Sequence, residues 1–274
     1  MSTPLVDLSG HHAVITGGAG GVGRALAATF AAAGATISLL DLAGADTKAG
    51  ADTKTVAAQI TDGGGKAAAH DCDVSDPEQV AAAFGWAEAT FGRPDILVNN
   101  AGVNQRGTSL GITEAEWDLT FAVNLKGYYH CARQLGGRLM EAGQPGSIVN
   151  VSSIGGVSSL GRGNFSYGIT KAGVNQLTRE LAVVWGRHGI RVNAVAPCQI
   201  ATEGLKRLGE RPSEEGNLLN TFLRGIPLGR LVETTEVAAA VAFLASDAAS
   251  MITGVVLPVD GGNLALNAGG TIGE

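Results

Sequence analysis

Charged residues are scarce in this sequence, and those present are more often acidic than basic. Only 16% of the residues are Asp, Glu, Lys or Arg, and the formal net charge is −6 at pH 7. A protein that binds nucleic acid needs a basic face to neutralise phosphates. The composition therefore argues against nucleic acid as a main partner.

Cysteine is also scarce, and the three cysteines, Cys72, Cys131 and Cys198, lie far apart. An odd number of cysteines without C-x-x-C spacing predicts neither a disulfide framework nor a structural zinc site, and suggests a reducing compartment. The five histidines contain no H-x-x-x-H pair, so we expect no catalytic metal.

Long hydrophobic runs are absent as well. The longest apolar stretch, 237–245, stops at Ser246 and Asp247 and is too short to cross a bilayer. The N-terminus lacks the basic segment and apolar run of a signal peptide. We therefore expect a cytoplasmic protein with no membrane partner.

Glycine, by contrast, is abundant, with 41 residues, and apolar runs alternate with longer helical patterns. The runs typical of strands are 13–16, 36–41, 67–72, 95–98, 147–152, 191–196 and 255–259. The patterns typical of helices are 22–33, 53–61, 77–91, 114–140, 166–188 and 235–245. Continuously apolar strands that alternate with helices predict an α/β fold: a doubly wound parallel sheet of about seven strands with helices on both faces. We expect 1–274 to form a single domain.

Two segments have no clear pattern. The stretch 200–232 is long for a loop, so we expect a substrate lid there; one or two short surface helices are the alternative. The tail 263–274 is rich in glycine, and we expect it to be disordered or packed on a neighbouring subunit.

A glycine-rich turn, Gly17-Gly-Ala-Gly-Gly21-Val-Gly23, follows the first strand and precedes a helix. This order suits a pyrophosphate, which can then approach backbone N–H groups at the positive end of a helix dipole. A plain tight turn is the alternative. Asp41 ends the second strand, where an acid can bind both ribose hydroxyls and repel a 2′-phosphate. It favours NAD over NADP, unless it only caps the following turn.

Tyr167 and Lys171 are four residues apart, so on a helix they share one face. Oxidation of an alcohol needs a base that takes the hydroxyl proton while hydride leaves. A free phenol has a pKa of about 10, which is too high for an efficient base at neutral pH. A nearby ammonium lowers that pKa. The Y-x-x-x-K spacing alone also fits an ordinary surface pair.

From about Leu8 to Gly262, the motifs come in the order of the short-chain dehydrogenase/reductase family, which this sequence resembles. The matching pieces are TGGAGGVG at 16–23, Asp73-Val74, NNAG at 99–102, Asn124 in VNLKG, Ser153 in IVNVSS, Tyr167 with Lys171, NAVAP at 193–197, ITG at 252–254 and VDGG at 259–262. The resemblance implies a Rossmann-type domain whose cofactor contacts are Gly17, Gly21, Val22, Gly23, Asp41, Asp73, Val74, Asn100, Ala101, Gly102, Tyr167, Lys171, Pro197 and Thr202.

The resemblance also implies roles for the reactive residues. Tyr167 is implied as the general acid and base, and Lys171 as the group that lowers its pKa and holds the nicotinamide ribose. Ser153 is implied to stabilise charge on the substrate oxygen, Asn124 to hold a water that relays protons to Lys171, and Thr202 to bind the carboxamide. The alternatives are a plain strand-end hydroxyl for Ser153 and a backbone-satisfying amide for Asn124.

The sequence departs from the family pattern twice. Cys198 stands where the family usually has glycine, so its side chain is expected either to touch ligand or to be a small buried hydrophobe. The segment between Ser153 and Tyr167 is one residue longer than usual, and we expect the extra residue to bulge in the loop 155–165.

These patterns predict an NAD-dependent enzyme that interconverts a secondary alcohol and a ketone. A 3-oxoacyl reductase and a catalytically silent NAD-binding protein are the alternatives. A homotetramer is implied by the resemblance.

Aromatic residues make up only 5% of the sequence, so we expect a small polar substrate such as a sugar, sugar acid or polyol rather than a bulky apolar one. The polar residues near the expected pocket are Asn104, Gln105, Arg106, Ser158, Ser159, Arg162 and Asn164. Either arginine could bind an anionic group, or be a solvated surface residue.

Overall fold

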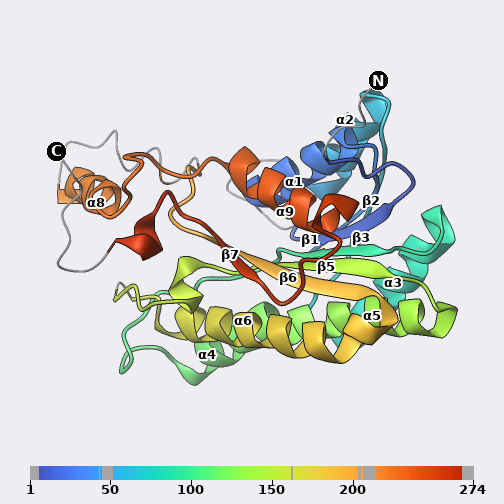
Figure 1. Cartoon of the computed structure of the whole chain (residues 1–274). Coiled ribbons are helices and arrows are strands. Elements are labelled where there is room, and N and C mark those ends of the chain that lie inside the picture. The colour runs from blue at the N-terminus through green and yellow to red at the C-terminus, as the bar shows by residue number, and fades with distance from the viewer. Residues whose placement is uncertain are drawn as a thin grey trace.

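A seven-stranded, fully parallel sheet forms the centre of the molecule (Figure 1). The computed structural model describes residues 6–42, 44, 52–161, 163–202, 205 and 214–266, with side chains omitted at 214–218. The strands are β1 (His12–Thr16), β2 (Thr36–Asp41), β3 (Lys66–Asp71), β4 (Ile96–Asn99), β5 (Gly146–Val151), β6 (Ile190–Pro197) and β7 (Val256–Val259). Their order is β3-β2-β1-β4-β5-β6-β7, which confirms the predicted fold class, and each strand agrees with its predicted bounds to within one residue.

Helices cover both faces of this sheet (Figure 1). One face carries α1 (Gly21–Ala32), α2 (Thr53–Asp62) and α9 (Thr234–Ala245). The other carries α3 (Pro77–Phe91), α4 (Glu114–Phe121), α5 (Gly127–Ala142) and α6 (Phe165–Trp185). The start of α3 follows directly from the sequence, because Pro77 opens the helix and the Asp76 carboxylate accepts hydrogen bonds from the backbone N–H groups of Glu78 and Gln79.

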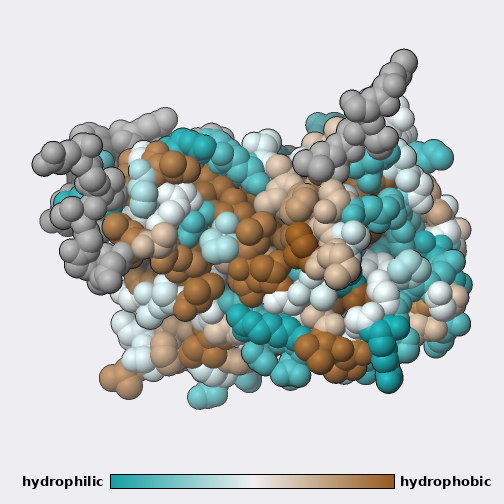
Figure 2. All heavy atoms as spheres, viewed as in Figure 1, coloured by the Kyte–Doolittle hydropathy of each residue, from teal (hydrophilic) through white to brown (hydrophobic). Residues whose placement is uncertain are grey.

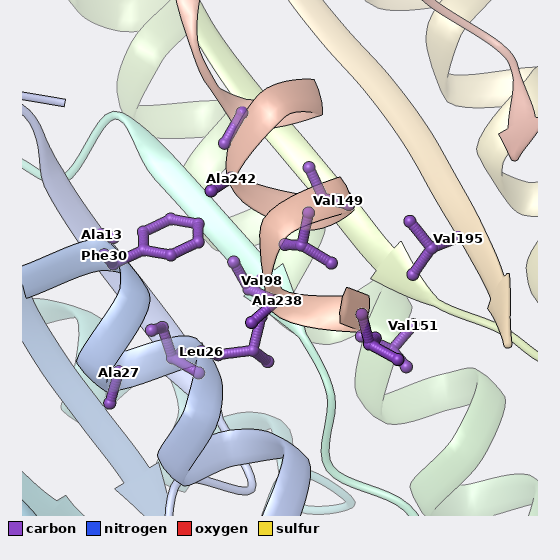
Figure 3. Close-up of a cluster of buried hydrophobic side chains, with 14 of the residues drawn as sticks. Ala13, Leu26, Ala27, Phe30, Val98, Val149, Val151, Val195, Ala238 and Ala242 are labelled. Atoms are coloured by element: carbon purple, nitrogen blue, oxygen red, sulfur yellow. The ribbon is translucent and has the colours of Figure 1, made fainter. Parts of the chain in front are cut away.

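Each face of the sheet has its own buried apolar cluster. The cluster under α1 and α9 joins these helices to the strands, and Figure 3 labels Ala13, Leu26, Ala27, Phe30, Val98, Val149, Val151, Val195, Ala238 and Ala242. The second cluster packs α3 and α5 against the opposite face. Because both faces are buried, the strands read as continuous apolar runs in the sequence.

One predicted helix, 114–140, is interrupted in the structure. It divides into α4, a π-helical turn η1 (Ala122–Lys126) and α5. Asn124 lies in the π-helical turn and is fully buried. Single π-helical turns inside α-helices are frequent at functional sites. The predicted helix 166–188 likewise ends earlier, at Trp185, and continues as the 3₁₀ turn η3 (Gly186–His188).

The predicted lid, 200–232, contains α8 (Glu214–Leu223), and a bridge between Ile200 and Val232 joins its ends. Residues 203–204 and 206–213 lie outside the described residues. The predicted tail, 263–274, begins with the short turn η5 (Asn263–Ala265), and 267–274 also lie outside the described residues. The lid and the single domain therefore stay predictions.

All three cysteines are buried and carry free thiols. In the described part of the chain, no group of three or more His, Cys, Asp or Glu side chains could hold a metal ion. No helix among the described residues is long and apolar enough to span a membrane.

Candidate active site

A cavity of about 890 Å³ opens where the carboxyl ends of β4, β5 and β6 meet the glycine turn and the start of α6. In parallel doubly wound sheets, ligands bind at this edge of the strands. The predicted residues that line the cavity are Val22, Asn100, Gly102, Ser153, Tyr167, Lys171, Pro197, Cys198 and Thr202. The structure thus brings together residues that are up to 180 positions apart in the sequence, from Val22 to Thr202.

The glycine turn is held to the end of β4 by a polar clamp. The hydroxyl oxygen of Thr16 accepts hydrogen bonds from the backbone N–H groups of Asn100 and Ala101, at 3.0 and 3.1 Å. The Asn100 amide donates to the carbonyl oxygens of Thr16 and Gly17, both at 3.0 Å. Gly17 has φ +68°, and a Cβ there would lie 2.8 Å from the Cα of Ala101. Only glycine allows this close approach.

The turn fits the pyrophosphate of a nicotinamide dinucleotide. Helix α1 begins at Gly21, and its N-cap, Gly20, has no side chain to bond the first N–H groups. A Cβ on Gly21 would meet no atom closer than 4.0 Å, so backbone is exposed on this side of the turn. In contrast, a Cβ on Gly23 would collide with the carbonyl oxygen of Gly17. The start of α1 is therefore open to an anion, at the end of a helix where backbone N–H groups lack intrahelical partners.

Asp41 lies beside the glycine turn. Its carboxylate accepts hydrogen bonds from the N–H groups of Ala19 and Leu42, both at 2.9 Å. The bond to Leu42 matches the turn-capping alternative, and the bond to Ala19 joins the carboxylate to the cofactor loop. A carboxylate has about four acceptor positions. Ribose hydroxyls can therefore bind Asp41 as well.

Two other predicted cofactor residues lie outside the main cavity. The Asp73 carboxylate accepts hydrogen bonds from the backbone N–H and hydroxyl of Ser75, at 2.9 and 2.7 Å. Val74 is buried, and a Cβ on Gly127 would lie 2.9 Å from its Cγ2. Both residues thus shape the turn after β3, and their contacts with the cofactor stay predictions.

Ser153, Tyr167 and Lys171 form the reactive part of the cavity. Ser153 follows β5, where its hydroxyl oxygen accepts a hydrogen bond from the Gly155 N–H at 3.1 Å. Its side chain acts on Tyr167 in the direction that lowers the pKa of the phenol. The Lys171 Nζ lies 5.6 Å from the centre of the Tyr167 ring. The longer segment between Ser153 and Tyr167 therefore still leaves both side chains in one cavity.

Burial dominates the electrostatics of this group. It raises the pKa of Tyr167, and the nearby Ser153 side chain only opposes that shift. Burial also lowers the pKa of Lys171 to about 7. The sequence predicted a tyrosine pKa lowered by the lysine. Without cofactor, the phenol shifts the other way, because both groups leave water and the lysine is only partly charged at neutral pH.

The side-chain amide of Asn124 is hydrogen-bonded to other groups of the protein. Its Oδ1 accepts from the N–H of Val103 and its Nδ2 donates to the Val103 carbonyl oxygen, both at 2.8 Å. Nδ2 also lies 3.3 Å from the Thr170 hydroxyl oxygen. The side chain therefore ties the loop after β4 to α6, and the predicted water would have to bind another atom of this residue.

Three residues at the site escaped the sequence analysis. Thr16 was part of the quoted motif but was given no role. Tyr128 is buried, and its hydroxyl oxygen accepts a hydrogen bond from Lys171 Nζ at 3.0 Å. Gln199 lines the cavity, and its buried Oε1 has no hydrogen-bond partner. Neither Tyr128 nor Gln199 belongs to a motif that would have drawn attention to it.

The substrate end of the cavity combines polar and apolar groups. Asn104, Arg106 and Asn164 line it, and the Asn104 Nδ2 donates to the Asn164 Oδ1 at 3.1 Å. Leu160 and Phe222 supply apolar surface. Of the other predicted polar residues, Ser158 and Ser159 line a neighbouring hollow, Gln105 lines neither, and Arg162 lies outside the described residues.

Cys198 lies in the cavity wall, yet it is 8% exposed and belongs to the apolar cluster under α1 and α9. Burial raises the pKa of its thiol to about 11. A neutral thiol is a poor nucleophile. Its buried position matches the small buried hydrophobe of the sequence analysis.

Comparisons with known proteins agree with this geometry. A family model described as Enoyl-(Acyl carrier protein) reductase matches residues 17–263. The chain is 39% identical to D-threitol dehydrogenase of Mycolicibacterium smegmatis, over 93% of each protein. It is 40% identical to galactitol 2-dehydrogenase (L-tagatose-forming) of Cereibacter sphaeroides, over 93% of this chain and 95% of that protein. The crystal structure of a gluconate 5-dehydrogenase from Burkholderia cenocepacia, in complex with NADP and tartrate, has a TM-score of 0.86 and 31% identity, over 95% of this chain and 98% of that one.

The buried lysine predicts a pH-dependent stability. The folded-state pKa of Lys171, about 7, lies below its ordinary value of 10.5. The unfolded chain therefore binds more protons between these values, so the burial penalty is full below about pH 7 and declines as pH rises. We expect Lys171→Met to increase the free energy of unfolding by on the order of 3 kcal/mol at pH 6, and by progressively less toward pH 10.

Denaturant titrations across this pH range measure the effect. The control is Lys126→Met, which removes an exposed lysine from the adjacent turn and should change little at any pH. A difference between Lys171→Met and the wild type that does not vary with pH would contradict the shifted pKa.

Proposed function

The chain belongs to the short-chain dehydrogenase/reductase family, and on that basis we propose that it transfers hydride between NAD(H) and a small polyhydroxylated alcohol or its ketone. The family makes it an oxidoreductase that uses a nicotinamide dinucleotide. The observation that carries the proposal is the grouping of Ser153, Tyr167 and Lys171 in one cavity beside the glycine turn. A catalytically silent protein would have no need of this grouping.

In the proposed reaction, the Tyr167 oxygen takes the proton of the substrate hydroxyl. Ser153, which lines the same cavity, donates to the same substrate oxygen and stabilises its developing charge. Bound NAD supplies the hydride acceptor and a positively charged ring. Any positive charge close to Tyr167 offsets the pKa rise that burial causes, and Lys171 contributes in proportion to its protonation.

Two kinds of observation support a polar substrate: the residues that line the cavity and the names of similar enzymes. Asn104, Arg106 and Asn164 line the cavity, and the unpaired Oε1 of Gln199 is an acceptor that a substrate hydroxyl can satisfy. Arg106 is exposed, so it can meet a carboxylate only at the mouth. The threitol and galactitol dehydrogenases act on polyols by name, which agrees with this assignment.

NAD is proposed over NADP because of the charges near Asp41. A small hollow next to it is lined by Asp52, Asp71 and Lys54. The lysine already lies 3.6 Å from Asp71. The acidic surroundings disfavour a 2′-phosphate. The similar gluconate 5-dehydrogenase was crystallised with NADP, so a protein of this fold can also bind the phosphorylated cofactor.

We also propose a cytoplasmic homotetramer built from single-domain subunits. β7 is an edge strand, and Figure 2 shows apolar residues gathered in a band across this side of the molecule. Large apolar side chains are exposed elsewhere on the surface too, including Val183 at 82% and Met251 at 94%. Exposed edges and apolar patches are commonly covered by a partner.

A substrate panel tests the proposed function. We expect NAD-dependent oxidation of polyols and sugar acids at a higher kcat/KM than that of steroid alcohols or 3-hydroxyacyl esters. Tyr167→Phe should lose about 10²–10⁴-fold in kcat while still binding NADH, because it lacks only the proton-transfer oxygen. A clear preference for the acyl esters would instead favour a 3-oxoacyl reductase. Full activity in Tyr167→Phe would remove the tyrosine from the mechanism.

Cofactor choice is tested separately at Asp41. The wild type should have a higher kcat/KM with NAD than with NADP, and Asp41→Ala should narrow the ratio by about tenfold because charge repulsion is relieved. Asp62→Ala removes a carboxylate at the exposed end of α2 and should leave the ratio unchanged. A wild-type enzyme that uses NADP equally well would refute the NAD assignment.

Gln199 provides a test of hydroxyl recognition. Gln199→Leu removes a buried unpaired oxygen, so we expect the free protein to be at least as stable as the wild type. Its kcat/KM for a polyol should nevertheless fall about tenfold, while that for a simple cyclic alcohol changes little. Gln59→Leu, at an exposed position of α2, is the control for stability. An equal loss of kcat/KM on both alcohols would show that Gln199 does not recognise the additional hydroxyl groups of the polyol.

A further inference from the structure

Lys171 is hydrogen-bonded through its ammonium group to two buried partners. Its Nζ donates to the Tyr128 hydroxyl oxygen at 3.0 Å and to the Val151 carbonyl oxygen at 2.7 Å. The Tyr128 hydroxyl donates in turn to the same carbonyl oxygen at 3.0 Å. The Lys171 ammonium, the Tyr128 hydroxyl and the Val151 carbonyl therefore form a closed triangle of three hydrogen bonds.

The triangle lies in the protein interior. Tyr128 is 1% exposed and Lys171 3% exposed. The Nζ is 4.7 Å from the centre of the Tyr128 ring and 5.6 Å from that of Tyr167, so the ammonium lies close to two tyrosine rings. Such ring faces attract a cation.

No carboxylate among the described residues pairs with Lys171. The titratable groups near the triangle are Tyr167 on α6 and Cys131 on α5, and burial raises the pKa of both. Both are therefore neutral at neutral pH. In the described part of the chain, the buried ammonium is compensated by a carbonyl oxygen, a phenol oxygen and two ring faces.

We propose that Tyr128 is a positioning residue: its hydroxyl holds the Lys171 ammonium in place and directs the remaining Nζ proton toward the cavity. This inference rests on the proposed function, in which Lys171 serves Tyr167 and the cofactor ribose. An ammonium has three protons. Two are used by Tyr128 and Val151, which leaves one for the ribose.

The same geometry occupies two of the three directions in which the Lys171 ammonium can donate. Tyr128 gives its own proton to the Val151 carbonyl oxygen, and burial keeps the pKa of Tyr128 well above its usual value. The Tyr128 hydroxyl therefore holds Lys171 as a neutral acceptor and does not compete with Tyr167 as an acid or base.

The chain offers a matched pair of variants. Tyr128→Phe keeps the packed ring and deletes the hydroxyl, while Tyr129→Phe makes the same change at the next position, which is 42% exposed. The first readout is the pKa of Lys171 in the cofactor-free protein, followed by NMR of ¹³Cε-labelled lysine and assigned with Lys171→Met. Loss of an acceptor disfavours the ammonium, so this pKa should fall in Tyr128→Phe and stay unchanged in Tyr129→Phe.

The second readout is a double-mutant cycle on the Kd for NADH. Tyr128→Phe should weaken binding about tenfold, the scale of a hydrogen bond to a charged group, and should have no effect in the Lys171→Met background. An equal effect in both backgrounds, or a lysine pKa unchanged by Tyr128→Phe, would overturn the proposal. If Tyr128→Phe fails to fold, 3-fluorotyrosine at this position, a weaker acceptor of nearly the same shape, should lower the pKa of Lys171 in the same direction.

Failure of the proposed function has a different signature. A wild-type protein that oxidises no alcohol with either cofactor would refute the function. The pKa of Lys171 in the cofactor-free variants would still decide the role of Tyr128.

Discussion

The clamp between Thr16 and Asn100 is the interaction on which the arrangement of the site depends. All seven strands run in one direction, so their carboxyl ends share one edge, and chain order reverses between β1 and β4. The Thr16 hydroxyl oxygen, at the end of β1, accepts two hydrogen bonds from the backbone after β4. The Asn100 amide, after β4, donates two hydrogen bonds to the carbonyl oxygens of Thr16 and Gly17. The glycine turn, the loop after β4 and, through Val103 and Asn124, helix α6 are thereby placed relative to one another.

Lys171 is buried with no carboxylate partner among the described residues, and burying a charge in this way is costly. A carboxylate close by would hold the lysine fully charged and cancel much of its field at Tyr167. A carbonyl oxygen and a phenol oxygen solvate the ammonium without adding negative charge. The net positive field at Tyr167 is then preserved, at the expense of a pKa close to neutrality.

Features governed by local pattern could be read from the sequence. Apolar runs defined the strands, Asp76 and Pro77 defined the start of α3, and ordered motifs located Ser153, Tyr167 and Lys171. Features that depend on contacts between distant segments could not. The π-helical turn at Asn124 accompanies a bond to Val103, and Tyr128 matters only because α5 places it against Lys171. Spacing also showed a charge beside Tyr167 but not the depth of burial, which raises the pKa of this tyrosine in the cofactor-free protein.

The glycine turn has a consequence for how the cofactor's charge is balanced. No residue from Gly17 to Gly23 carries a titratable side chain, and the N-cap Gly20 offers only backbone. The pyrophosphate would therefore be held by amide dipoles whose strength does not vary with proton concentration. Binding of the diphosphate would then not depend on pH, whereas the ribose contact proposed for Lys171 would, because the pKa of that lysine is about 7.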